Sequence, residues 1–166
     1  PAAAVDVDLA HVTASVDAEC DRRGRPLAAG ELEAATHDVY LRGKSVSGAA
    51  YVRAVNTIHA YGRAAASLFE RYDVLLTATL GRPAIPIGHL FEDPGQIVKR
   101  LFEYMPNTQA FNNSGQPAMT VPLAWSAGGL PIGLQFVAAT GEEGVLFRLA
   151  GQLERARPWF DRVAPL

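Results

Sequence analysis

The sequence is poor in the features that would point directly to a membrane, a secretory route or a disulfide framework. It contains a single cysteine, Cys20, so no disulfide can form within the chain, and this usage is typical of a reducing compartment. No apolar run approaches the ~18–20 residues of a membrane-spanning helix. The first residues lack the basic start and apolar centre of a secretory signal. We therefore expect a cytoplasmic protein that does not contact a membrane.

An excess of charge of one sign is also missing. The sequence has 15 lysine and arginine residues against 17 aspartate and glutamate residues, which gives a formal net charge of −2. This balance offers no electrostatic attraction for nucleic acid or for an anionic membrane, so we expect neither as a partner. The 49% of apolar residues and 19% of charged residues are instead typical of a globular domain with a substantial core.

Patterns that bind metals or phosphate are absent as well. No two histidines have the i, i+3 or i, i+4 spacing of a helical metal site, and no carboxylate–histidine cluster is visible. Gly43-Lys44-Ser45 resembles the end of a phosphate-binding loop, but Asp38 stands where the first glycine of that loop belongs. The sequence therefore predicts no metal site and no cofactor.

The first half of the chain has the apolar spacing of helices. One stripe predicts a helix from Val5 to about Arg23, and a second predicts a helix over 30–42 with Gly43 as its left-handed cap. A third helix is predicted over 48–71, opened by Ser47 as its N-cap. A helix of that length needs a large partner surface, so we expect a large exposed apolar surface centred on this helix and on Pro117–Trp125.

The second half of the chain has the apolar patterns of β-strands. Residues 72–77 form a continuous apolar run, typical of a strand that is buried on both faces. Two further strands are predicted over 118–125 and 131–138, with Gly128-Gly129 in the turn between them.

Two more helices complete the prediction. One is short and covers 96–104, and the other follows a capping box formed by Thr140 and Glu143. The expected fold class is α/β, with helices packed around a small mixed β-sheet.

Side-chain amides and hydroxyls gather in residues 104–117, at the entrance of the strand predicted over 118–125. Open sheets often place ligands at such points, which makes this segment a candidate site. The alternative is a loop whose polar side chains form local turn hydrogen bonds, and the residues alone favour that alternative.

Several short runs of the chain occur together in a specific order and spacing. They are the run 72–77, Ile87-Gly88, Phe111-Asn112, Gly115-Gln116-Pro117-Ala118, Val121-Pro122, Gly129-Leu130-Pro131-Ile132-Gly133-Leu134-Gln135, and Leu149-Ala150 with Glu154. In this order they resemble the C-terminal end of amidase signature enzymes. Ala78 stands where the family usually has proline, and residues 136–140 also depart from the usual run. The resemblance extends from about Leu27 to the end of the chain.

The resemblance implies a hydrolase of carboxamide C–N bonds. Enzymes of this family use a serine nucleophile, a second serine and a lysine, all upstream of the matching region. This chain has no such Gly/Ser-rich stretch, and neither Lys44 nor Lys99 matches the place of that lysine. The resemblance therefore implies that residues 1–166 are the C-terminal portion of an amidase signature domain, without its N-terminal catalytic part and with no catalytic residue of its own.

Two alternatives remain open. The chain could be a non-catalytic binding or regulatory subunit that pairs with another chain. It could also be a small free-standing enzyme using Ser114 or Cys20, which is disfavoured because no base is placed nearby.

The partners that the resemblance implies are a small-molecule amide and the missing N-terminal catalytic part, while a homo-oligomer is left open. Asn112 and Gln116 have a second interpretation, in which their side chains tie the turn to the neighbouring backbone. By resemblance, the substrate-binding residues are Thr79, Leu80, Thr108, Phe111 and Asn112.

Overall fold

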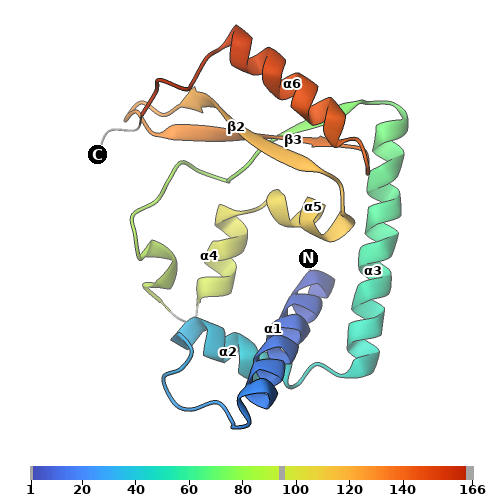
Figure 1. Ribbon diagram of the computed structural model, residues 1–166, viewed down its shortest axis with the longest axis vertical. Helices are drawn as coiled ribbons and strands as arrows, with labels where there is room; N and C mark the ends of the chain where they lie inside the picture. The colour runs from blue at the N-terminus through green and yellow to red at the C-terminus, as the bar shows by residue number, and fades with distance from the viewer. Residues whose placement is uncertain (1, 94–95, 164–166) are drawn as a thin grey trace. The chain divides into compact units, whose positions relative to one another are not determined.

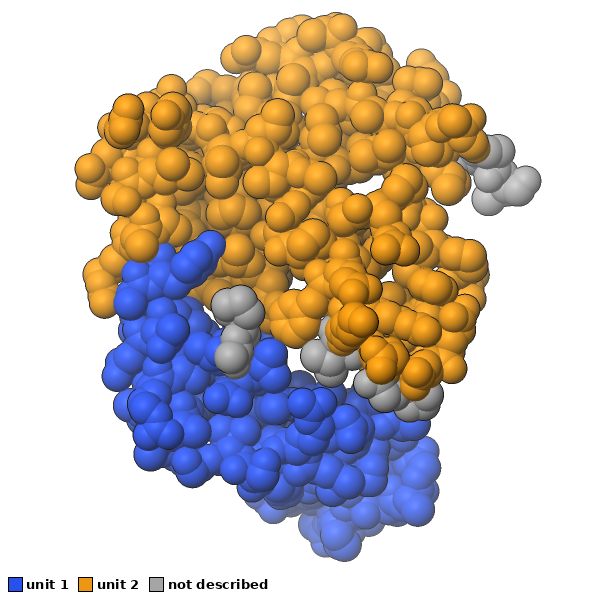
Figure 2. Space-filling model, turned by 180° about the vertical axis from the view of Figure 1, so that it is seen from behind, with its two compact units in different colours: residues 1–61 blue, residues 62–166 orange. Residues whose placement is uncertain are grey.

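The computed structural model describes residues 2–93 and 96–163, and the chain divides into two compact units. The first unit is Pro1–Tyr61 and the second is Gly62–Leu166 (Figure 2). In the described part of the chain, no helix is long and apolar enough to cross a membrane.

The first unit is built from helices. It contains α1 (Ala2–Arg23), α2 (Ala34–Gly43) and most of α3 (Gly48–Ala66), as Figure 1 shows. The Ser47 hydroxyl accepts a hydrogen bond from the Ala50 N–H at 3.1 Å, which confirms Ser47 as the N-cap of α3. α3 ends at Ala66 and continues as a 3₁₀ turn, η1 (Ser67–Glu70), so the helical region stops one residue before the predicted Arg71.

Two details of α2 differ from the prediction. The helix begins at Ala34 instead of residue 30, because Gly30 adopts a φ of +80° that helical residues do not take. Gly43 is not a left-handed cap. It is buried in α2, and a Cβ there would lie 2.0 Å from Thr13 Oγ1 and 2.3 Å from the Leu9 carbonyl oxygen. Glycine at this position allows α1 and α2 to approach closely.

The second unit contains a three-stranded sheet. Its strands are β1 (Val74–Ala78), β2 (Ala118–Trp125) and β3 (Pro131–Ala138), in the order β1-β3-β2. Both pairs are antiparallel, and β2 and β3 form the predicted hairpin. The fold class is confirmed, although the described sheet is antiparallel where a mixed sheet was predicted. The direction of β1 depends on the path of the chain between Ala78 and β3, which the residues of the strand do not reveal.

One face of the sheet packs against α6 (Glu143–Ala156), and the core of the unit lies between them (Figure 1). Leu149 and Leu153 pack against this core, as the predicted stripe requires. Burying a leucine as completely as Leu146, which is 4% exposed, stabilises the fold by about 1.5–3 kcal/mol. The buried residues of the cluster are Val121, Phe136, Ala138 and Leu146.

The predicted capping box of the last helix does not form. The N-cap residue is Glu142, and no side chain caps the helix. Gly141, with a φ of +84°, turns the chain between Thr140 and the helix, so the Thr140 hydroxyl is not at the capping position.

The opposite face of the sheet looks toward two short helices, α4 (Ile97–Tyr104) and α5 (Thr108–Ser114), with η2 (His89–Phe91) before them (Figure 1). α5 was not predicted.

The expectation that β1 is buried on both faces is wrong for this chain, because β1 lies at an edge of the sheet and the Leu76 side chain is 55% exposed. The predicted exposure of α3 is seen at Val52 and Tyr61. The predicted exposure of Pro117–Trp125 is wrong for its large apolar side chains, which are buried or half-buried in the hairpin.

Candidate functional site

The end of β1 and the start of α5 lie side by side, although they are far apart in the sequence. The Asn107 side-chain amide donates a hydrogen bond to the Ala78 carbonyl oxygen at 2.8 Å. Three residues later, the Gly81 N–H donates to the Tyr104 carbonyl oxygen at 2.8 Å. The first bond joins the segment of Thr79 and Leu80 to the N-terminal end of α5, and the second joins it to the C-terminal end of α4. The two segments that carry the predicted site residues therefore meet in one region.

The residues of α5 differ in how much of each side chain is accessible. Phe111 is 9% exposed, so most of its ring is packed inside the second unit. Thr108 is half-buried and Asn112 is exposed. A molecule bound against this helix would thus meet the Asn112 side chain directly, but only an edge of the Phe111 ring.

The turn after α5 is held by its own residues. Gly115 has a φ of +78° and donates its N–H to the Phe111 carbonyl oxygen at 3.0 Å, which confirms the special backbone conformation predicted there. The Ser114 hydroxyl donates to the Gln116 side-chain oxygen, and Gln116 is only 6% exposed. Gln116 therefore serves the turn, which is the structural interpretation of the two that the sequence left open.

A row of polar side chains crosses the sheet on the face opposite α6. Thr77, Gln135 and Thr120 stand opposite one another in the register of the three strands. The Gln135 amide, which is 4% exposed, donates to the Thr77 hydroxyl at 3.3 Å. Such a row places hydrogen-bonding groups beside the end of β1.

Thr79 belongs to the same polar face. Its hydroxyl lies 3.1 Å from the Thr120 hydroxyl. Gly133 lies between these two threonines, and a Cβ at Gly133 would lie 2.7 Å from Thr120 Cγ2 and 2.9 Å from Thr79 Oγ1. Sequence reasoning missed Thr120, because its position beside Thr79 depends on the strand order β1-β3-β2 and on the register.

The described residues of this region do not form a nucleophile with an adjacent base. Ser114 donates its hydroxyl to an amide oxygen, which is too weak a base to activate a serine. Among residues 2–93 and 96–163, no group of three or more His, Cys, Asp or Glu side chains could hold a metal ion. The described residues of this region therefore bring polar side chains together without an activated nucleophile.

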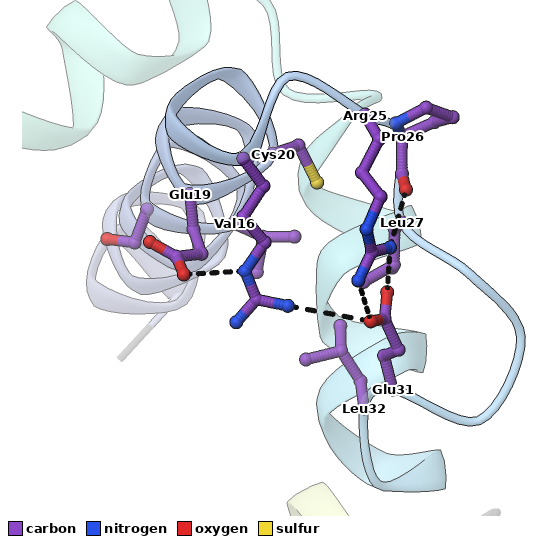
Figure 3. A pocket seen from close by; sticks show the side chains of 10 residues that line it. Val16, Glu19, Cys20, Arg25, Pro26, Leu27, Glu31 and Leu32 are labelled. Atoms are coloured by element: carbon purple, nitrogen blue, oxygen red, sulfur yellow. Dashed lines mark hydrogen bonds and ion pairs between the residues drawn. The ribbon is translucent and has the colours of Figure 1, made fainter.

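A separate pocket of about 200 Å³ lies within the first unit, between the end of α1 and the loop that leads to α2 (Figure 3). Its walls include Val16, Cys20 and Leu32. The Glu31 carboxylate at its rim accepts hydrogen bonds from Arg25 at 2.5 and 2.9 Å. These bonds and the Ala28 N–H lower the pKa of Glu31 to about 2. The pocket contains none of the predicted site residues, and its Glu31 and Arg25 already satisfy each other.

Comparisons with known proteins identify the family of the chain. The profile of the family described as Amidase matches residues 23–147. The Mycobacterium leprae protein AmiC is 41% identical over 108 residues, which are 64% of this chain and 23% of AmiC. The 6-aminohexanoate-cyclic-dimer hydrolase of Paenarthrobacter ureafaciens is 33% identical over 148 residues, which are 84% of this chain and 30% of that enzyme.

A solved structure of a 6-aminohexanoate cyclic dimer hydrolase has the same fold. It is 31% identical in sequence and superposes with a TM-score of 0.83 over 91% of this chain, but over only 33% of its own chain. The chain thus spans about a quarter to a third of the length of the relatives that it matches.

Proposed function

Because the chain belongs to the amidase family, we propose that residues 1–166 are the C-terminal portion of a serine hydrolase that cleaves carboxamide C–N bonds. One observation carries the proposal. The solved hydrolase superposes on 91% of this chain while two thirds of the hydrolase remain unmatched. In the family, the serine nucleophile and its lysine lie outside the region that this chain resembles. This portion therefore supplies a pocket wall and scaffold, and the missing part supplies the reacting groups.

The proposed pocket wall consists of the end of β1 and the exposed side of α5. The hydrogen bond from Asn107 to Ala78 supports this assignment, because it brings the two segments together. The hydroxyl pair of Thr79 and Thr120 would present polar groups beside them. The proposed substrate-binding residues are Thr79, Leu80, Thr108, Phe111 and Asn112.

The proposed substrate is a small-molecule amide, processed in the cytoplasm without nucleic acid or membrane as a partner. The name of the Paenarthrobacter relative describes a hydrolase of a cyclic dimer of 6-aminohexanoate. A cyclic amide is therefore a natural first compound for a substrate panel, beside the linear amides that we propose for this chain.

The coding region directly upstream tests the proposal. A reading frame that continues upstream into a Gly/Ser-rich stretch and a further-upstream lysine would support the C-terminal portion of an amidase. A frame that ends immediately upstream, with no such stretch elsewhere in the same transcript, would favour the non-catalytic binding or regulatory subunit.

The pocket wall is tested separately, in the intact enzyme. Replacing Phe111 by leucine keeps most of the packing of this buried ring. We expect it to change the ratio of kcat/KM between short-chain and aromatic amides by about tenfold, which is the usual effect of a small shape change in a pocket. Labelling of the upstream serine by a small reactive probe should persist.

Phe147→Leu is the matched control for this experiment, since Phe147 is a 77% exposed phenylalanine on α6, which covers the other face of the sheet. If Phe111→Leu leaves the ranking of substrates unchanged, α5 does not line the pocket and acts as scaffold. The same conclusion follows if the control variant changes the ranking equally.

A further inference from the structure

One side chain bridges the two segments of the proposed pocket wall. The Asn107 amide donates to the Ala78 carbonyl oxygen at 2.8 Å. Ala78 is the last residue of β1 and directly precedes Thr79. Asn107 directly precedes Thr108, which is the first residue of α5. A single hydrogen bond thus fastens the backbone next to Thr79 to the backbone next to Thr108.

The local sequence predicts a different hydrogen bond for Asn107. This residue stands at the N-cap position of α5, where the side-chain oxygen of an asparagine usually accepts an N–H of the first turn. No side-chain cap forms in this helix. The Asn107 amide instead reaches Ala78, which lies 29 positions away in the sequence. Asn107 therefore serves the contact between the two segments and does not cap its own helix.

The far end of the segment after β1 is fixed by its backbone. The Gly81 N–H donates to the Tyr104 carbonyl oxygen at 2.8 Å. A Cβ at Gly81 would lie 2.5 Å from the Glu103 carbonyl oxygen, so Gly81 fits directly against the C-terminal end of α4. Thr79 and Leu80 lie between this contact and the end of β1. Both ends of this pair are therefore held against the corner between α4 and α5.

Thr79 is also fastened to the sheet. Its N–H donates to the Gly133 carbonyl oxygen at 3.1 Å, and its hydroxyl lies 3.1 Å from the Thr120 hydroxyl. These two contacts do not involve α5. Loss of the Asn107 bond should therefore leave Thr79 in the sheet and change the position of α5 relative to it.

We propose that Asn107 is a positioning residue of the pocket wall: it sets the distance between Thr79 and α5 and thereby selects among amides by the shape of their acyl part. This inference rests on the proposed function. A displacement of about 1 Å in a binding site can change a rate by about 100-fold, so one hydrogen bond at this place is enough to alter substrate choice. The role does not require Asn107 to touch the substrate.

The test uses a full-length chimera in which this chain replaces the matching region of the Paenarthrobacter hydrolase. Asn107→Asp keeps the size of the side chain and its ability to cap a helix, but a carboxylate cannot donate to the Ala78 carbonyl. Asn107→Ser also keeps a capping oxygen and adds no charge, and its hydroxyl ends about 1.3 Å short of the amide nitrogen. Both variants should change the ratio of kcat/KM between short-chain and aromatic amides by at least about fivefold.

This ratio separates positioning from stabilisation. A side chain that only stabilises the fold changes the folded fraction, which scales the rates of all substrates equally and leaves their ratio unchanged. Asn56→Asp is the matched control, because it makes the same change at an exposed asparagine of α3, and it should not alter the ratio. An active chimera whose ratio is unchanged in both Asn107 variants would overturn the inference. A change in Asn107→Asp alone, or an equal change in the control, would overturn it as well.

The chain alone gives a readout that does not depend on catalysis. In NMR spectra, Asn107→Ser and Asn107→Asp should both move the backbone amide resonances of Thr79 and Leu80, although these residues are far from position 107 in the sequence. Asn56→Asp should leave the same resonances in place. If Thr79 and Leu80 do not respond to either Asn107 variant, the inference is wrong, whether or not the chimera is active.

The two experiments also distinguish this inference from the proposed function. An active chimera with unchanged substrate ratios would refute the role of Asn107 and leave the proposed function standing. A folded chimera without amide hydrolysis would refute the proposed function, and the resonances of Thr79 and Leu80 would still decide whether Asn107 positions this segment. The same resonances decide if the chimera does not fold.

Discussion

Gly43 and Gly48 are both helical glycines of the first unit, but only one of them has room for a side chain. A Cβ at Gly43 would collide with Thr13 Oγ1 and the Leu9 carbonyl oxygen, whereas a Cβ at Gly48 meets nothing within 4 Å. Gly43→Ala should therefore lower the free energy of unfolding by about 1–3 kcal/mol or more. Gly48→Ala should raise it by a few tenths to about 1 kcal/mol.

Urea unfolding of the two variants beside the unaltered chain measures this difference. A Gly43→Ala protein as stable as the Gly48→Ala protein would show that α1 and α2 do not approach as closely as described.

The carboxylate of Glu31 gives a prediction for pH. Its pKa is lowered from 4.5 to about 2, first by the hydrogen bonds from Arg25 and then by the Ala28 N–H. A group whose pKa is lower in the folded state contributes stability above its unfolded pKa and loses it as the pH falls. This contribution should be complete above about pH 4.5 and should disappear between pH 4.5 and about 2.

Replacing Arg25 by glutamine should return the pKa of Glu31 toward 4.5, as carbon-detected NMR of the side-chain carboxyl would show. Because the pair is exposed, added salt should weaken the effect in the unaltered chain. A Glu31 pKa that does not respond to Arg25→Gln would contradict the assigned cause.

At the scale of elements, α6 offers a direct comparison between two neighbouring positions. Leu146 is 4% exposed within the core cluster, and Phe147 is 77% exposed. Leu146→Ala should cost about 2–5 kcal/mol of unfolding free energy through the cavity it leaves. Phe147→Ala should stay within about 0.5 kcal/mol.

Urea unfolding of both variants measures these free energies, provided that the slope of the unfolding free energy against urea concentration is the same as in the unaltered chain. If Phe147→Ala proved the more damaging change, α6 would have to present a different face to the sheet.

Some helices and strands could be predicted from the sequence alone, and others could not. The hairpin of β2 and β3 and the stripe of α6 were predictable, because alternation and helical spacing are local signals. α5 was missed because its residues, TQAFNNS, include asparagine and serine, which compete with helix formation when read locally. The exposure of β1 could not be predicted either, since an apolar run does not reveal whether its strand lies at the edge or in the centre of the sheet.

The candidate site was predictable only as two separate segments. Residues 104–117 stood out by their polar composition, and Thr79 and Leu80 entered through the family resemblance. Their meeting depends on the Asn107–Ala78 hydrogen bond, which joins residues 29 positions apart in the sequence. Thr120 could not be assigned to the candidate site from the sequence, because its place depends on which strands are neighbours in the sheet, and no local sequence pattern shows that order.

At the scale of the whole molecule, the described residues of the candidate site bring polar side chains together without a nucleophile and an adjacent base. Thr120 and Asn112 are exposed, while Gln135 is buried. The residues that the family uses to form and break the covalent intermediate lie outside the region that this chain resembles. Losing the nucleophile and its base together removes the covalent route, so this chain by itself should not hydrolyse amides.

Release of ammonia or amine from a panel of aliphatic, aryl and cyclic amides tests this claim most directly. The panel is run with this chain alone and with the full-length chimera carrying the upstream part of the Paenarthrobacter hydrolase. We predict release indistinguishable from buffer for the chain alone and clear turnover for the folded chimera. Turnover by the chain alone that is abolished by a serine-directed probe would contradict the account.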